Sequence, residues 1–285
     1  MDSTEWKIGQ YPLHVLVLAV EVKGVAVPVY FRIYTHKGVL SEKERINFMR
    51  KSLAIIDMKG KLLVADREFI GKDWFDFLSK NQIDFVIRLR KGIYQNWIDL
   101  QGESYEKLEK KALKKGYAHK LFTLREHSYR LEIYRNQSRN SSRNQSEKES
   151  LVYWLTNTLR KKRVGKQYYR KRWKIEYCFK HLWLPHMAKT NGFNLEQVAF
   201  QDTNKIRLLI AFVIVVYILA IQQGILQQKK ETVRQIRYSN GTTYRAVSIF
   251  RDGLYRLKEK VGSVGVFRTY LEQITPKKSN LIKIV

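Results

Sequence analysis

Tyr169, Arg172 and Glu176 are spaced so that one helix would present all three side chains on one stripe. An adjoining stripe of that helix is apolar and predicts a core-facing side, formed by Ile175, Cys178, Phe179 and Leu182. Glu176 is an acid on an otherwise cationic and aromatic stripe. It can pair with bases one turn away, such as Lys180, or it can serve as a ligand in a site with other acids.

Two further acids flank strands that the sequence predicts. Asp66 ends the short apolar segment GKLLVAD, and the ends of strands are where α/β sheets gather ligands. Its ordinary alternative is a turn or helix-capping aspartate. Asp2 precedes the first strand that we predict, and its alternative is a solvated acid near the chain end. Carboxylates brought together from three such elements suit Mg²⁺ or Mn²⁺, and two such ions support phosphodiester chemistry.

The charge of the chain indicates a polyanionic partner. The 285 residues include 54 Lys and Arg against 26 Asp and Glu, which gives a formal net charge of +28. Nucleic acid is the expected partner and an anionic membrane surface the alternative. The single cysteine, Cys178, excludes an internal disulfide or a cysteine-based zinc site, and the six histidines show no H-E-x-x-H spacing.

Apolar runs give little support to a membrane protein. Met1 is followed by polar residues, so we expect no signal peptide. The run from Leu208 to Ile221 is shorter than a bilayer requires and predicts a buried helix. We therefore expect a cytoplasmic, nucleoid-associated protein with no membrane partner.

The pattern of apolar residues predicts a mixed α/β sheet with flanking helices. Strands are expected in 14–34, as a hairpin broken at Lys23-Gly24, and in 60–66, 83–91, 119–136 and 151–157. Helices are expected in 41–56, capped by Ser41, and in 72–81, 169–183, 208–221 and 242–261. The polar stretch 137–150 predicts a loop.

The order of three motifs resembles that of DDE transposases of bacterial insertion sequences, in the branch with the signature Tyr-x₂-Arg-x₃-Glu-x₆-Lys. The matching stretches are DSTEWKIG, ADREFIGKDWF and YRKRWKIEYCFKHL followed by KTNGFNLE. The resemblance implies that Asp2, Asp66 and Glu176 are catalytic and hold two Mg²⁺ or Mn²⁺ ions. It also implies that Tyr169, Arg172 and Lys189 contact DNA.

The same resemblance implies an RNase H-like fold, cleavage and strand transfer of double-stranded DNA at element ends and target, and a homodimer on paired ends. The corresponding divisions are a first part of the core at 1–91, a β-rich insertion between the second and third acids at 92–160, a second part of the core at 161–226 and a helical C-terminal region at 227–285.

Two departures from the family pattern give a competing hypothesis. Trp183 stands where the signature lysine belongs, and Lys189 follows only after an apparent insertion that contains Pro185. Nothing but Met1 precedes Asp2, so we expect the upstream half of the first strand and an N-terminal DNA-binding domain to be missing, and Asp2 to lie on a frayed end. The alternative function is therefore an inactive, truncated remnant that still binds DNA, and a weaker one is a peripheral membrane protein.

Overall fold

A computed structural model describes most of the chain in two compact units. The first unit comprises Met1–Ser3, Leu16–Leu18 and Lys37–Trp173, and the second comprises Thr4–Val15, Ala19–His36 and Lys174–Val285. The described residues are 1–8, 11–36, 38–90, 92, 98–100, 102–136, 150–159, 162–183, 202–230, 235–239, 241–262, 265, 266, 268 and 269.

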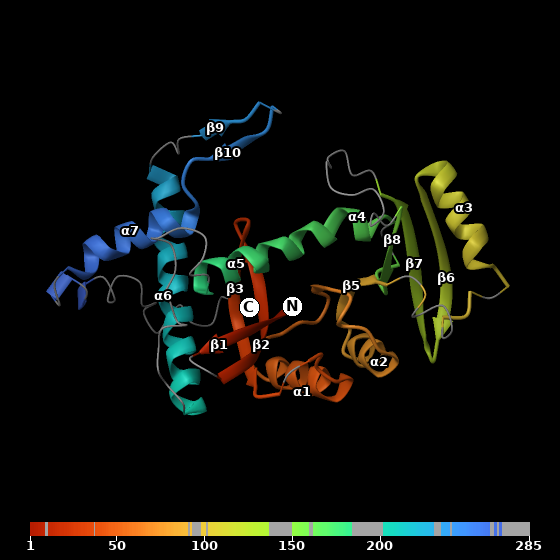
Figure 1. Cartoon of the computed structure of the whole chain (residues 1–285), viewed down its shortest axis with the longest axis horizontal. Helices are drawn as coiled ribbons and strands as arrows, with labels where there is room; N and C mark the ends of the chain where they lie inside the picture. The colour runs from red at the N-terminus through yellow and green to blue at the C-terminus, as the bar shows by residue number, and fades with distance from the viewer. Residues whose placement is uncertain are drawn as a thin grey trace. The chain divides into compact units, whose positions relative to one another are not determined.

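A five-stranded mixed sheet dominates the first unit, with the strand order β4-β5-β8-β7-β6 (Figure 1). Its strands are β4 (Leu62–Ala65), β5 (Asp84–Leu89), β6 (Tyr117–Leu124), β7 (His127–Arg135) and β8 (Leu151–Thr156). β4 and β5 are parallel, and the other pairs are antiparallel. The sheet, its flanking helices and the helical C-terminal region confirm the predicted mixed α/β, RNase H-like class.

Alternating side chains of β5 pack against helices on both faces of this sheet. Phe85 stacks on Phe75 of α2 (Lys72–Lys80), with ring centroids 5.2 Å apart. The neighbouring Val86 points the other way and clusters with Val164 and Tyr169, in α4 (Val164–Tyr168) and η2 (Tyr169–Arg172). The strand is therefore the centre of a three-layer core.

Two predicted helix starts are confirmed in the first unit, and a third helix was missed. Ser41 caps α1 (Glu42–Leu53) in a full capping box with Glu44. Glu42 in turn accepts backbone hydrogen bonds from the first turn of α2, including one of 3.0 Å from Asp73. Helix α3 (Tyr105–Lys115) was not predicted, and it lies along β6 and β7 in Figure 1.

The predicted N-terminal hairpin is confirmed. β2 (Tyr11–Val22) and β3 (Val25–Tyr34) turn at Lys23 and Gly24, whose φ values are 50° and 83°. Two successive residues with positive φ are the requirement of a tight hairpin turn of the primed type. An additional strand, β1 (Asp2–Ile8), completes the order β1-β2-β3, so Asp2 begins a strand rather than preceding the first one.

The second unit is built around α6 (Thr203–Lys230), which is twice the length of the apolar run from which it was predicted. By length and composition alone this helix could cross a membrane, and 44% of its most apolar 18-residue stretch is buried. The buried side packs within the unit, where the hydroxyl of Tyr217 donates to the carbonyl of Ala26 on β3 at 3.2 Å. Helix α5 (Trp173–Trp183) also belongs mainly to this unit, and its predicted apolar stripe is confirmed as buried.

The last predicted helix is half correct. The segment 242–261 contains β10 (Thr243–Arg245), paired with β9 (Gln235–Arg237), and only then α7 (Ile249–Val261). Ser248 caps α7 by accepting from the backbone of Arg251. The β-branched and aromatic residues Thr242, Thr243 and Tyr244 favour a strand, but the helical periodicity of the whole segment led to a helix being predicted there. The predicted 137–150 loop lies largely outside the described residues.

Helices α6 and α7 approach so closely that glycine is required at their crossing. A methyl group added to Gly253 would lie 1.7 Å from the carbonyl oxygen of Ala220, and one added to Gly224 would lie 2.0 Å from that of Ile249. We expect Gly253→Ala to lower the free energy of unfolding by about 2–3 kcal/mol, because backbone atoms must shift. Urea denaturation checks this expectation.

Gly262, at the end of α7, is the matched control. Its added methyl would meet only the Glu259 carbonyl at 3.4 Å, and its backbone is in the ordinary helical region. Gly262→Ala should leave stability unchanged or slightly raised. Equal losses from both variants would contradict the close helix crossing.

Candidate active site

Asp66 and Asp2 meet at the end of β4. Asp66 is the first residue after that strand, as predicted. The backbone nitrogen of Met1 donates to the Val64 carbonyl of β4 at 2.9 Å, which brings Asp2 to the same place. Asp2 is only 7% exposed, and its Oδ1 accepts from the backbone of Ser3 at 3.1 Å. The expectation that Asp2 lies on a frayed end is therefore wrong, because backbone pairing and burial hold it.

Arg172 joins the two aspartates. Its Nη1 donates to Oδ2 of Asp2 at 3.0 Å and lies 3.8 Å from Oδ2 of Asp66. The guanidinium also stands over the rings of Tyr169 and Trp173, at 5.6 and 5.5 Å from their centroids. A single cation thus draws together two carboxylates that are 64 residues apart in the chain. It fixes them by charge, while the aromatic rings orient its plane.

Tyr169 completes this arrangement by binding the other side of Asp66. Its hydroxyl donates to Asp66 Oδ1 at 2.7 Å, and the backbone nitrogen of Arg67 donates to the same oxygen at 2.7 Å. Burial and the Asp66 charge raise the pKa of Tyr169 well above its usual range, so the hydroxyl stays protonated and donates. Tyr169 and Arg172 therefore both act on the carboxylates, a role that the sequence did not reveal.

The two aspartates have opposite electrostatic surroundings. Burial raises the pKa of Asp2 to about 6, against the opposing effect of the Arg172 charge. Burial also acts to raise the pKa of Asp66. There, however, the hydrogen bonds from Tyr169 and Arg67 and the Arg172 charge outweigh it, so its pKa lies below the usual value. Near neutral pH Asp2 is therefore ionised, and the charge of Arg172 does not fully offset the cost of burying its carboxylate.

The carboxylate oxygens of Asp2 and Asp66 are of the chemical type that binds hard divalent cations. Two carboxylates converge on one positive charge, and carboxylate oxygen is the ligand that Mg²⁺ and Mn²⁺ prefer. Within the described residues, no three His, Cys, Asp or Glu side chains form a group that could hold a metal ion. In the described part of the chain, Asp2 and Asp66 are two carboxylates that could hold such an ion, and Arg172 contacts both of them.

Glu176 and Lys189 were also predicted as residues of this site. Glu176 is half-buried on α5 and belongs to the second compact unit, whereas Asp2, Asp66, Tyr169 and Arg172 belong to the first. Lys189 lies outside the described residues. The helical segment is also not uniform, because a 3₁₀ turn, η2, separates α4 from α5. Such a turn within a helix is common at functional positions.

Sequence reasoning missed three polar neighbours of the aspartates. The hydroxyl of Ser3 donates to Oε1 of Glu68 at 2.6 Å, and the charge of Glu68 contributes to the raised pKa of Asp2. Arg88 contributes to the lowered pKa of Asp66. A signal for Arg88 was present, because it is the one base within the otherwise apolar interior of β5. Ser3 and Glu68 gave no comparable signal.

A buried acid holds the start of the helical segment that carries Tyr169 and Arg172. Glu132 of β7 is fully buried and accepts backbone hydrogen bonds from Val164 at 3.3 Å and Gly165 at 3.0 Å, in the first turn of α4. Arg130 pairs with it at 3.1 Å. The hydroxyls of Tyr134 and Tyr117 also donate to it, at 3.1 and 3.4 Å. A carboxylate at a helix start is favourable, and here it joins the segment to the sheet.

Replacement of Glu132 by glutamine should therefore destabilise the fold. The change leaves the buried Arg130 without its counter-charge, and we expect the free energy of unfolding to fall by roughly 3 kcal/mol. Tyr117→Phe, which removes a single long hydrogen bond to the same carboxylate, should cost about 1 kcal/mol or less. Urea denaturation of both variants measures the difference, and equal losses would show that the Glu132 charge is not what matters.

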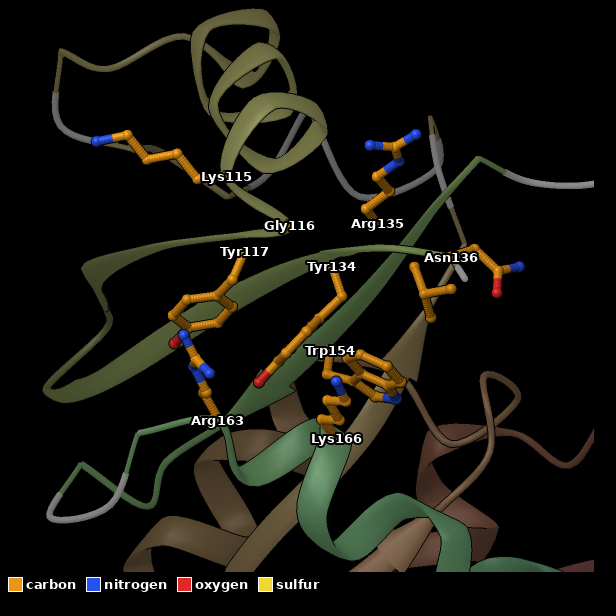
Figure 2. A pocket seen from close by; sticks show the side chains of 10 residues that line it. Lys115, Gly116, Tyr117, Tyr134, Arg135, Asn136, Trp154, Arg163 and Lys166 are labelled. Atoms are coloured by element: carbon orange, nitrogen blue, oxygen red, sulfur yellow. The ribbon is translucent and has the colours of Figure 1, made fainter. Parts of the chain in front are cut away.

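A basic and aromatic pocket of about 420 Å³ lies beside the start of α4. In Figure 2, Tyr117, Tyr134 and Trp154 project from the strands toward Arg163 and Lys166 at the start of α4. The Arg163 guanidinium stands 5.1 Å from the centroid of the Tyr117 ring, and Tyr134 and Trp154 meet edge to face at 4.8 Å. None of the described residues that line the pocket is acidic. Aromatic faces with nearby cations are suited to the bases and phosphates of a nucleic acid.

Comparison with known proteins gives one family match. The family model described as a transposase DDE domain matches residues 41–219, a range that includes Asp66, Tyr169, Arg172 and Glu176 but not Asp2. A search of individual curated proteins found no match. Domains of this family generally use divalent metal ions and act on DNA. Because the match covers more than half of the chain, the protein belongs to the transposases with a DDE domain.

Proposed function

We propose that this chain is the catalytic part of an insertion-sequence transposase of the Tyr-Arg-Glu-Lys branch, which cleaves phosphodiester bonds at element ends and joins them to target DNA. The observation that carries the proposal is the convergence of Asp2 and Asp66 on Arg172, with Tyr169 bound to Asp66. These are the residue types and positions that the family signature requires.

In this proposal Asp2, Asp66 and Glu176 hold two Mg²⁺ or Mn²⁺ ions. The metal ions would neutralise charge on the phosphate and activate water or a 3′-hydroxyl. Support for Glu176 comes from its position four residues after Arg172 in the motif and from its place within the matched family range. Asp2 lies outside that range, and its support is its bond to Arg172.

Arg172 has two roles in this proposal. Without metal it neutralises the aspartates. If a metal ion supplied that charge, Arg172 would be able to turn toward a DNA phosphate, which its planar fork would bind through two hydrogen bonds. Tyr169 keeps Asp66 oriented throughout. Lys189 is proposed as a further phosphate contact, on the motif alone. We also propose a nucleoid-associated homodimer on paired ends, as the family resemblance implies.

The net charge of +28 supports DNA as the partner, and the basic residues of the pocket are suited to contacts with its phosphates. Binding should weaken steeply as salt rises, because each phosphate contact releases counterions. Preference for anionic vesicles over DNA would favour the peripheral membrane alternative instead.

The deciding experiment incubates the purified full chain with a duplex that carries the DNA bordering its gene on both sides. We expect strand cleavage at the element borders in Mg²⁺ or Mn²⁺ and none in EDTA. Salt-sensitive binding without metal-dependent cleavage would favour the alternative, an inactive DNA-binding remnant.

A further inference from the structure

The hairpin of β9 and β10 is exposed on both of its faces. Its three cross-strand pairs are Gln235 with Arg245, Ile236 with Tyr244 and Arg237 with Thr243. All of these side chains are exposed, Tyr244 to 60%. Figure 1 shows the hairpin as an arm that leads into α7. A two-stranded ribbon with such short strands buries little apolar surface of its own.

The register gives the ribbon two different faces. Residues directly opposite each other in an antiparallel pair share a face, and successive residues alternate. One face therefore carries Gln235, Arg237, Thr243 and Arg245, all polar. The other carries Ile236 and Tyr244, joined by Tyr238, whose ring lies edge to face with Tyr244 at 5.5 Å.

The chemistry of the polar face is specific as well as positive. No acidic residue occurs in the sequence between Glu231 and Asp252, so the ribbon carries arginines without a counter-charge nearby in the chain. Arginine, glutamine and threonine are the side chains that read guanine, adenine and thymine edges in the major groove. That groove is wide enough to admit a two-stranded ribbon.

We propose that the β9–β10 ribbon enters the major groove of duplex DNA and reads base edges with Arg237 and Arg245. The aromatic face would then lie toward the groove wall, where tyrosine hydroxyls can donate to phosphates. The ribbon belongs to the second compact unit and the Asp2–Asp66 site to the first. The inference depends on the proposed function only in taking duplex DNA as the substrate.

The test uses the full chain and the gene-border duplex, with three double variants. Arg237→Gln with Arg245→Gln removes charge and fork, and Arg237→Lys with Arg245→Lys keeps the charge but removes the fork. Lys51→Gln with Lys258→Gln is the charge-matched control, because both lysines are exposed on other helices. Affinity is measured as a function of salt, and dimethyl sulfate reports protection of guanine N7, which faces the major groove.

We expect the glutamine pair to weaken binding at least about tenfold and to abolish guanine protection at its contact positions. The lysine pair should retain most of the salt dependence but lose the protection, and the control should stay within about twofold of the unmodified chain. The ribbon assignment would be overturned by unchanged guanine protection in the glutamine pair, or by an equal loss of DNA affinity in the control. The proposed function would still stand if cleavage persists. Absence of DNA binding by the unmodified chain would overturn both. Ribbon variants that lose binding to phosphatidylserine vesicles but keep their binding to DNA would overturn the ribbon assignment alone.

Discussion

Replacement of Asp66 by asparagine is expected to abolish metal-dependent DNA cleavage, with a loss of at least about a thousandfold. The amide keeps the size of the side chain and can still accept from Tyr169, but it removes the charge that a divalent ion requires. Several kcal/mol of charge stabilisation on the transferring phosphate depend on that ion, which corresponds to a loss of this size. The measurement is cleavage of the gene-border duplex in Mg²⁺ and Mn²⁺.

Asp57→Asn is the matched control for this variant. Asp57 is exposed, and its Oδ1 accepts a local backbone hydrogen bond from Lys59 at 2.9 Å. The control should cleave at the unmodified rate, and both variants should bind DNA with similar affinity. Substantial cleavage by Asp66→Asn would remove Asp66 from the metal site and with it the proposed mechanism.

Local patterns were enough to predict most of the fold. The Lys23-Gly24 turn, the Ser41 capping box and the apolar β5 strand each have a physical cause within a few residues, and each is confirmed. The failures involve competition between local signals. The helical pattern before Ser248 concealed β10, and the interpretation of 92–160 as a β-rich insertion left out the Ser104-capped helix α3.

The sequence pointed to Asp2, Asp66, Tyr169 and Arg172, but it did not predict the hydrogen bonds and ion pairs that join them. Helical spacing placed Tyr169 and Arg172 together, and strand position indicated Asp66. The bond between Arg172 and Asp2 joins residues 170 apart, and no local pattern specifies such a pair. The burial of Glu132 was also not predictable from local sequence. An acid in a strand of mixed polarity is normally expected to face solvent, whereas Glu132 accepts from the backbone at the start of α4.

Replacement of the two aspartates should change the stability of the fold in opposite directions. Asp2→Asn is expected to stabilise the metal-free protein at pH 7.5 by up to about 3 kcal/mol while abolishing cleavage. The pKa of Asp2 is about 6 in the folded chain, above its usual value of 3.8, so the folded state disfavours the ionised form. That penalty is fully present above pH 6 and disappears as the pH falls toward 4. The gain from asparagine should therefore vanish at pH 4.

Asp66→Asn should have the opposite sign. The pKa of Asp66 lies below its usual value, so its charge stabilises the folded state at neutral pH, and removing that charge lowers stability. Thermal denaturation of the two variants at pH 7.5 and pH 4 measures both effects. Mg²⁺ should raise the melting temperature of the unmodified protein but not of Asp2→Asn, because the ion supplies the compensation that Asp2 lacks. Destabilisation by Asp2→Asn at pH 7.5 would mean that the Arg172 ion pair outweighs the burial of the charge, and that a cation is not needed to stabilise Asp2.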